Sequence, residues 1–174
     1  MEKERLTPLV EAAKSKDADA FAEIYSSYYK SLYKSAYYLL GNPQDAEDTV
    51  METVADAFSS IHKLRVAEAF EGWIFKILYN KARRKRGTTI YKATVELSEN
   101  IESDDKSGDD IGDNVDLLRA LGTLRDDERA VVVLSICEGY SSQDVSKIMG
   151  VNANTVRSKQ MRALAKLRAF MEKE

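Results

Sequence analysis

The stretch YSSQDVSKIMGVNANTVRSKQMRALAKLR, which runs from Tyr140 to Arg168, predicts two helices joined by a tight turn. Ser141 can cap the first helix, because a serine side chain accepts a hydrogen bond from the free amides of a first helical turn. Gly150 can end that helix in the left-handed backbone conformation. Asn152 or Asn154 can then cap a second helix of about five turns.

The second of these helices, expected to end near Met171, has two different faces. Apolar and small residues gather on one side and polar residues on the other, at about 100° per residue. The inward side is predicted to carry Val156, Gln160, Ala163 and Leu167, and the outward side Asn154, Arg157, Ser158, Met161 and Arg162. Every charged residue from Ala153 to Phe170 is basic, which favours binding to phosphates over simple exposure to water.

This layout is that of a DNA-binding helix-turn-helix, in which the first turns of the second helix meet base edges in the major groove. The remaining cations of such a helix bind the phosphate backbone. The expected base-reading residues are Asn154, Arg157 and Ser158, and the expected phosphate-binding residues are Lys159, Arg162 and Lys166. The alternative is a basic amphipathic helix packed in a bundle.

The chain has 174 residues, which is enough for one domain or for two small domains. Its composition, 44% hydrophobic and 32% charged, is typical of a soluble globular protein. No apolar run approaches the roughly 20 residues that span a bilayer, and the start MEKERLTPLVEAAK lacks a signal-peptide core. We therefore expect a cytoplasmic protein. The chain has one cysteine, Cys137, and one histidine, His62, so it can form neither an internal disulfide nor a zinc cluster of these residues. Cys137 is expected to lie in the core, and a redox role is the less favoured alternative.

The net charge of −3 is unevenly distributed along the chain. Residues 1–86 carry 14 basic and 13 acidic side chains, residues 87–114 carry 2 and 8, and residues 115–174 carry 10 and 8. The acidic excess therefore lies in the middle. Two nearly neutral blocks with local basic patches remain compatible with nucleic-acid binding.

The first block predicts an all-α fold. A helix is expected from Ala18 to Leu40, and Gly41-Asn42-Pro43 should break the chain and cap the next helix. That next helix should bury Ala46, Val50, Val54, Ala57 and Ile61. After a loop near residues 65–68, a third helix, FEGWIFKILYNKARRKR, should end at Gly87.

The composition of the central segment, residues 88–113, predicts a flexible acidic linker, because the segment is rich in Asp, Ser and Gly after Leu97. Local β pairing within residues 88–95 is an alternative for its first part. The helical pattern resumes near Asn114, with Leu117 to Leu124 leading into a second apolar helix at Glu128–Cys137. Together with the helix-turn-helix, these segments predict a four-helix carboxy-terminal domain.

The two blocks together resemble RNA polymerase sigma factors of the extracytoplasmic-function (ECF) type, within the sigma-70 family. The resemblance covers nearly the whole chain and rests on the order and spacing of several segments. They are the helix start at Phe21–Tyr25, GNPQDAEDTVMETV, WIFKILYN, LLRALGTLRDDERAVVVLSICEGYSSQDVSKIMG and TVRSKQMRALAKLR.

This resemblance implies a protein that binds core RNA polymerase and directs it to promoters. Residues 1–87 would be sigma region 2, which binds the polymerase and captures the melted minus-ten element. Residues 114–174 would be region 4, which reads the minus-thirty-five element through the helix-turn-helix. A cognate anti-sigma factor is a further expected partner, whereas no cofactor, small-molecule substrate or membrane insertion is expected.

The resemblance also places the two surfaces of region 2. The core polymerase would bind the acidic cluster Asp45, Glu47, Asp48 and Glu52, which could otherwise be solvated acids at a helix start. The minus-ten element would be held by Asn80, Arg83, Arg84, Lys76 and Arg65. Trp73 and Tyr79 are possible stacking platforms but are more typical of core positions.

Two positions depart from the family pattern. Met51 stands where the family commonly has Gln, which removes one polar contact to polymerase. Ala82 and Arg83 stand where the family has an Asp after Asn80, which changes the minus-ten contacts.

Two other classes of function compete with this interpretation. An enzyme is disfavoured, because the chain has no nucleotide-binding Gly loop and no metal-binding constellation. A stand-alone helix-turn-helix regulator is the stronger alternative, since it would bind promoter duplex without polymerase. A helical adaptor without a DNA role is opposed by the cationic helices.

Overall fold

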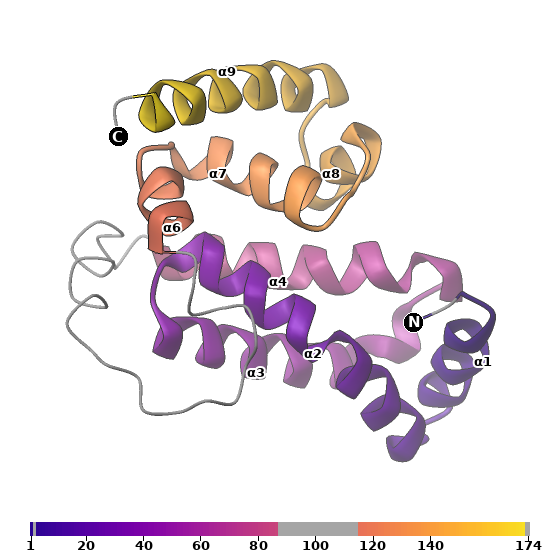
Figure 1. Ribbon diagram of the computed structural model, residues 1–174. Helices are drawn as coiled ribbons and strands as arrows, with labels where there is room; N and C mark the ends of the chain where they lie inside the picture. Colours follow the sequence, from indigo (N-terminus) through magenta and orange to yellow (C-terminus); the bar gives the residue numbers. More distant parts are fainter. Residues whose placement is uncertain (2, 87–114, 173–174) are drawn as a thin grey trace.

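The structure is a computed structural model that describes residues 1, 3–86 and 115–172, and these residues contain helices and no strands (Figure 1). The amino-terminal half contains α1 (Lys3–Lys14), α2 (Ala18–Leu40), α3 (Pro43–Ser60), two 3₁₀ turns (Ile61–Lys63 and Ala67–Ala69) and α4 (Phe70–Arg86). The carboxy-terminal half contains α6 (Val115–Gly122), α7 (Asp126–Val132), a π-helical turn (Val133–Cys137), α8 (Ser142–Met149) and α9 (Ala153–Met171). The all-α prediction is confirmed.

The amino-terminal half is built on the antiparallel pair α2 and α3, with α4 packed against both. Gly41 ends α2 with a φ of 72°, and the Asn42 side chain accepts a hydrogen bond from the amide of Asp45 at 2.9 Å. The observed bounds of α2 and α4 are those predicted. The predicted stripe of α3 is buried at all positions except Val54, which is half-buried.

Helix α1 was not among the predicted elements. It packs across α2 and the two 3₁₀ turns, and it buries Leu6, Val10 and Ala13. The 3₁₀ turns occupy the segment that was expected to be a simple loop, with Ile61 and Ala67 turned into the core.

The helix-turn-helix forms as predicted. Ser141 Oγ accepts from the amide of Asp144 at 3.1 Å, and Gly150 has a φ of 70°. Asn152, rather than Asn154, caps α9, since its Oδ1 accepts from the Asn154 amide at 2.8 Å. Val156 and Ala163 are buried beneath α9, so its inward face is the one expected.

The helix predicted at Glu128–Cys137 differs in its second half. Helix α7 is regular to Val132, and the turn from Val133 to Cys137 is π-helical, with the amide of Glu138 donating to the Val133 carbonyl at 3.1 Å. A π turn holds one more residue than an α turn, so side chains after it point in a different direction. This turn places Glu138 opposite α2.

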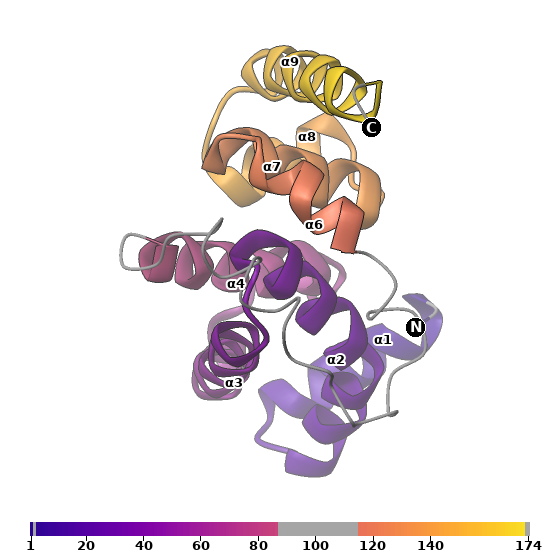
Figure 2. The ribbon, with the colours of Figure 1, turned by 60° about the vertical axis from the view of Figure 1, so that its left-hand side comes forward.

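The two halves pack against each other. Helix α8 lies on α4, while α7 and the π turn lie on α2 (Figures 1 and 2). The predicted linker 88–113, its possible β pairing and the helix end at Gly87 lie outside the described residues.

Among the residues that the structure describes, Arg129 has the largest fully buried side chain. Its guanidinium donates to the carbonyls of Leu121 at 2.8 Å, Leu124 at 3.0 Å and Leu39 at 3.3 Å. The first two carbonyls close the turn between α6 and α7, and the third ends α2 in the other half. A buried guanidinium needs such partners, because an unpaired buried charge is strongly destabilising.

We predict that Arg129→Met lowers the free energy of unfolding by about 3 kcal/mol, because the carbonyls lose their donor in a buried site. Urea unfolding followed by circular dichroism measures the change. Arg125→Met is the matched control, since Arg125 is an exposed arginine on the same turn. An equal loss of stability in both variants would contradict the assigned role.

Candidate nucleic-acid and protein interfaces

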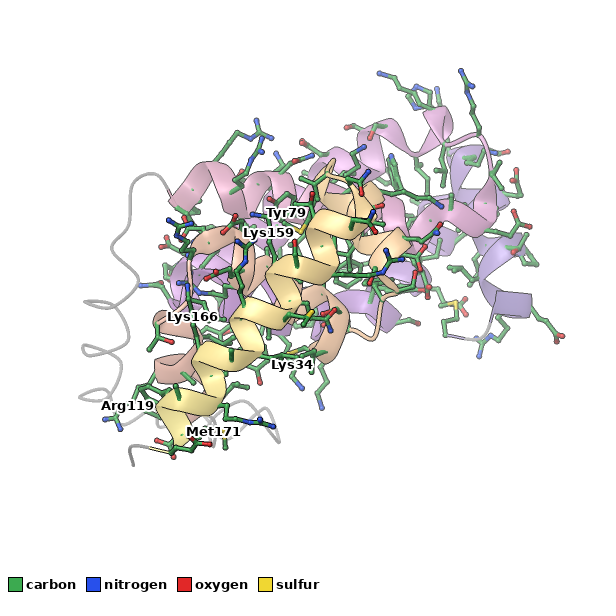
Figure 3. The ribbon with its side chains drawn as sticks, turned by 90° about the horizontal axis from the view of Figure 1, so that it is seen from above. Lys34, Tyr79, Arg119, Lys159, Lys166 and Met171 are labelled. Carbon is green, nitrogen blue, oxygen red and sulfur yellow. The ribbon has the colours of Figure 1, made fainter. Side chains whose placement is uncertain are left out.

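The outward face of α9 is uncovered (Figure 3). The predicted outward residues Asn154, Arg157, Ser158, Met161 and Arg162 are all exposed, and the Met161 side chain is among the most exposed apolar groups. This face combines hydrogen-bonding groups, guanidinium groups and one apolar tip. Such a set suits base edges in a major groove, where a methionine can contact a thymine methyl group.

Arg157 is held by its own helix. Its Nη1 donates to Asn154 Oδ1 at 2.6 Å, while Ser158 Oγ donates to the Thr155 carbonyl at 3.1 Å. The guanidinium has five N–H donors, so one hydrogen bond to Asn154 leaves others for a guanine edge. Asn154 and Arg157 thus form one paired polar group at the start of α9.

Two lysines expected to bind phosphates are engaged inside the domain. Lys159 forms an ion pair with Asp127, and Lys166 Nζ lies 2.7 Å from Glu128 Oε2. Figure 3 shows both lysines on one flank of α9. Burial acts to raise the pKa of Asp127 and of Glu128, but the paired lysines outweigh it and hold both pKa values below their ordinary range. These lysines therefore attach α9 to α7.

Part of the cationic end of α4 is paired with acids of α3. Lys81 Nζ lies 2.6 Å from Asp56 and 3.7 Å from Glu52, and Lys85 lies 3.4 Å from Asp48, all on α3. The basic run that ends α4 extends from Lys81 to Arg86. Opposite charges on α3 hold two of its members.

The residues predicted to hold the minus-ten element are mostly exposed. Arg65, Lys76, Arg83 and Arg84 face solvent, whereas Asn80 is half-buried. The Asn80 carbonyl accepts from Arg84 Nε at 3.3 Å. The structure therefore leaves four predicted cations accessible along α4 and the loop before it.

The two aromatic candidates on α4 are packed inside. Tyr79 is only 8% exposed, and the Arg83 guanidinium lies 5.9 Å from its ring centroid. Burial raises the pKa of Tyr79 above its ordinary value although Arg83 lowers it. Trp73 is half-buried, with its ring 5.9 Å from that of Phe70. Tyr79 is thus a core residue covered by a cation, and Trp73 also packs against the core.

The predicted polymerase-binding acids lie along α3. Glu47 and Glu52 are exposed, while Asp45 and Asp48 are half-buried. Asp48 accepts from Gln44 at 3.2 Å in addition to its pairing with Lys85. Between these acids, Met51 is 69% exposed, so an apolar side chain stands in the middle of the acidic face.

A ladder of tyrosine rings on α2 was missed by the sequence analysis. Tyr25, Tyr29, Tyr33 and Tyr37 follow one another at four-residue intervals, with successive ring centroids 5.7, 6.1 and 6.2 Å apart. Tyr29 is 42% exposed. The four-residue spacing of these tyrosines is the sequence signal for the ladder, since residues four apart lie on one face of a helix.

The described residues include no group of acids, Cys or His that could hold a metal ion. No helix among them is long and apolar enough to cross a membrane. Cys137 is half-buried against the core, and burial raises the pKa of its thiol.

Comparison with known families matches both halves of the chain. The family described as Sigma-70 region 2 matches residues 24–88, and the family described as Sigma-70, region 4 matches residues 114–167. The two matches follow the order predicted from the sequence.

Similar proteins are RNA polymerase sigma factors. SigE of Mycolicibacterium smegmatis, an ECF sigma factor, is 34% identical over 145 residues, which are 79% of this chain but only 56% of that protein. SigV of Bacillus subtilis is 31% identical over 80% of this chain and 83% of its own.

Among solved structures, the Bartonella quintana sigma factor RpoE in complex with the anti-sigma factor NepR has a TM-score of 0.69 at 27% identity, covering 87% of this chain and 96% of that one. CnrH in complex with the cytosolic domain of CnrY has a TM-score of 0.77 at 23% identity, covering 98% and 99%, which supports the fold. The chain therefore belongs to the sigma-70 family of RNA polymerase sigma factors, as a member of the ECF type.

Proposed function

We propose that this protein binds core RNA polymerase and directs transcription initiation at a restricted set of promoters. The observation that carries this proposal is the presence of both sigma regions, in order, with exposed cationic faces on α4 and α9. In this proposal, residues 1–87 act as region 2, residues 88–113 connect the regions, and residues 114–174 act as region 4. The protein would be a dissociable, non-catalytic specificity subunit working in the cytoplasm.

Region 4 would read the minus-thirty-five element through α9. The paired Asn154 and Arg157, together with Ser158 and Met161, face the bases, and Arg162 holds a phosphate. Lys159 is best assigned to the α7–α9 attachment, although its remaining donors leave it able to approach a phosphate.

Region 2 would hold the melted minus-ten element on the exposed side of α4. Arg83, Arg84 and Lys76 would follow the backbone, and Arg65 would contribute from the preceding loop. The Asn80 amide, which both donates and accepts hydrogen bonds, would read an unpaired base.

The core polymerase would dock on α3. Glu47, Asp48 and Glu52 supply negative charge, and Asp45 lies at the start of the same helix. The exposed Met51 adds apolar area where the family commonly has a polar contact. A patch with an apolar centre and a charged rim is typical of a specific protein interface.

An anti-sigma factor is the remaining proposed partner. The RpoE structure to which this chain is similar was solved with the anti-sigma factor NepR bound. We infer that this chain is also controlled by a protein inhibitor of that class.

Reconstituted transcription tests the proposed function. Purified bacterial core polymerase mixed with this protein should initiate at discrete sites on genomic fragments, and core alone should not. Tight duplex binding by the protein alone, without polymerase-dependent initiation, would instead favour the stand-alone regulator. Core binding without initiation would leave an adaptor.

Base reading by α9 is tested at Arg157. We predict that Arg157→Ala changes the ranking of minus-thirty-five sequences, with about 1–3 kcal/mol lost at one base pair. Initiation by the holoenzyme on a promoter library measures the ranking, and Ser158→Ala should alter it at a neighbouring position. Arg162→Ala is the control, since loss of a phosphate contact weakens all sequences alike. Equal weakening by Arg157→Ala on every sequence would make Arg157 a phosphate contact.

Polymerase docking is tested at Asp48. We predict that Asp48→Lys weakens binding to core polymerase about tenfold, because a charge reversal opposes the partner's basic groups. Asp56→Lys is the matched control, because Asp56 also lies on α3 and also pairs with a lysine of α4. Labelled protein titrated with core measures both affinities. Equal affinities for the two variants would overturn the assignment of Asp48.

A further inference from the structure

Helix α1 lies before the part of the chain that matches Sigma-70 region 2, since that match begins at residue 24. The helix packs against α2 and against both 3₁₀ turns of the segment that joins α3 to α4. Figure 1 shows α1 at the end of the bundle where α3 leads into α4. Its buried residues Leu6, Val10 and Ala13 are spaced by four and three residues, so a single stripe of the helix, the α1 stripe, faces inward.

The α1 stripe is what holds this helix in place. The helix has 12 residues, and an isolated helix of that length is marginal in water. Pro8 lies inside it and has no amide hydrogen, so one intrahelical hydrogen bond is missing. The ion pair of Arg5 with Glu23 is exposed on both sides and adds little. Val10, at 0% exposure, is therefore the central anchor of α1.

The turn between α1 and α2 fixes the direction of α1. Lys16 has a φ of 71°, a conformation that residues other than glycine adopt only when their surroundings hold them there. The Lys16 amide donates to the Ala13 carbonyl at 3.0 Å, and the Asp17 amide donates to the Ala12 carbonyl at 3.2 Å. Asp17 Oδ1 also accepts from the Ala20 amide at 3.0 Å and so caps α2. The same short turn thus ends α1 and begins α2.

The segment 61–70, on which α1 packs, has every third residue buried. Ile61, Leu64, Ala67 and Phe70 are each at most 8% exposed. This period is that of a 3₁₀ helix, in which residues three apart lie on the same side. The residues between these anchors are exposed, namely His62, Lys63, Arg65, Val66, Glu68 and Ala69.

The shape of this segment depends on its buried side chains, because its own hydrogen bonds are local. The Leu64 amide donates to the Ile61 carbonyl at 3.0 Å, and the Ala69 amide donates to the Val66 carbonyl at 3.1 Å. Each of these bonds closes a single turn. Arg65 lies between the two turns and is exposed. A side chain that reads a base must be held to within about 0.5 Å by the residues that support it.

We propose that α1 is a positioning element for recognition of the minus-ten element. The α1 stripe holds the segment 61–70 in one conformation, and the segment in turn presents Arg65 to the unpaired strand. The part that concerns recognition rests on the proposed function. The support of the segment by α1 does not, because hydrogen exchange measures it without polymerase or DNA.

Hydrogen exchange of the free protein tests the support. Val10→Ala removes two carbon atoms from a fully buried site, so the amides of Leu64 and Ala69 should exchange about tenfold faster than in the wild type. Val50→Ala is the matched control, because Val50 is equally buried in the same half but lies on α3 about 16 Å along the helix before Ile61. Unchanged helical circular dichroism checks that each variant is folded.

Initiation by the holoenzyme on two promoter libraries tests the effect on recognition. When the minus-ten element is varied, Val10→Ala should change the relative use of sequences several-fold, because Arg65 is no longer held in one position. When the minus-thirty-five element is varied, the ranking should stay that of the wild type, because α9 lies in the other half. Leu6→Ala, about one turn earlier in α1, should act in the same direction as Val10→Ala.

The outcomes separate the two parts of the proposal. Unchanged exchange of the segment 61–70 in both α1 variants, or equally faster exchange in Val50→Ala, would overturn its support by α1. Faster exchange with an unchanged minus-ten ranking would overturn the role of α1 in recognition. If neither the wild type nor any variant initiates with core polymerase while Val10→Ala still speeds exchange, the proposed function fails and the support by α1 stands.

Discussion

The buried guanidinium of Arg129 is the interaction on which the rest of the structure depends. Helices leave carbonyls without partners at their carboxyl ends, and this one side chain serves such carbonyls from Leu39 at the end of α2 and Leu121 near the end of α6. A buried charge is tolerated only when it is fully paired. The need to pair the Arg129 guanidinium therefore fixes the α6–α7 turn and brings the end of α2 to that turn. The fold of region 4 and its position on region 2 thus depend on the same set of hydrogen bonds.

Charge pairing around this point decides which cations remain exposed. The first turn of α7 carries three consecutive acids, and each of them pairs with a different cation. Asp126 pairs with Arg86 at the end of α4, Asp127 with Lys159 of α9, and Glu128 with Lys166 of α9. Helix α3 takes two more cations from α4. What stays exposed on α9 is the face with Arg157 and Arg162. The exposed cationic surface of α9 is therefore defined as much by which cations the acids pair with as by the cations themselves.

Local signals in the sequence predicted most of the fold, whereas the arrangement of the sites depended on distant partners. Caps, glycine turns and apolar spacing predicted the bounds of α2, α4, α8 and α9, because each signal acts within a few residues. The pairing of Lys159 with Asp127 spans 32 residues, and that of Ser31 with Glu138 spans 107. Such pairs leave no periodic pattern, so the internal role of Lys159 could not be predicted. The outward face of α9 could be predicted, since it follows from helix geometry alone.

The interface between the halves combines polar contacts with apolar packing, since buried residues of both halves belong to one hydrophobic core. Glu138, Ser31, Asp126 and Arg86 are all polar, and water can replace each of their hydrogen bonds when the halves part. The apolar part of the interface would expose hydrophobic surface if the halves parted, at a free-energy cost that grows with its area. The aromatic pair Phe75 and Tyr140 contributes such a cost, but Tyr140 also carries a hydroxyl group that water can solvate. The relative position of the two halves is therefore set by both kinds of contact: the polar pairs fix the alignment of α7 and the π turn on α2 and α4, and the apolar packing contributes the area-dependent stability.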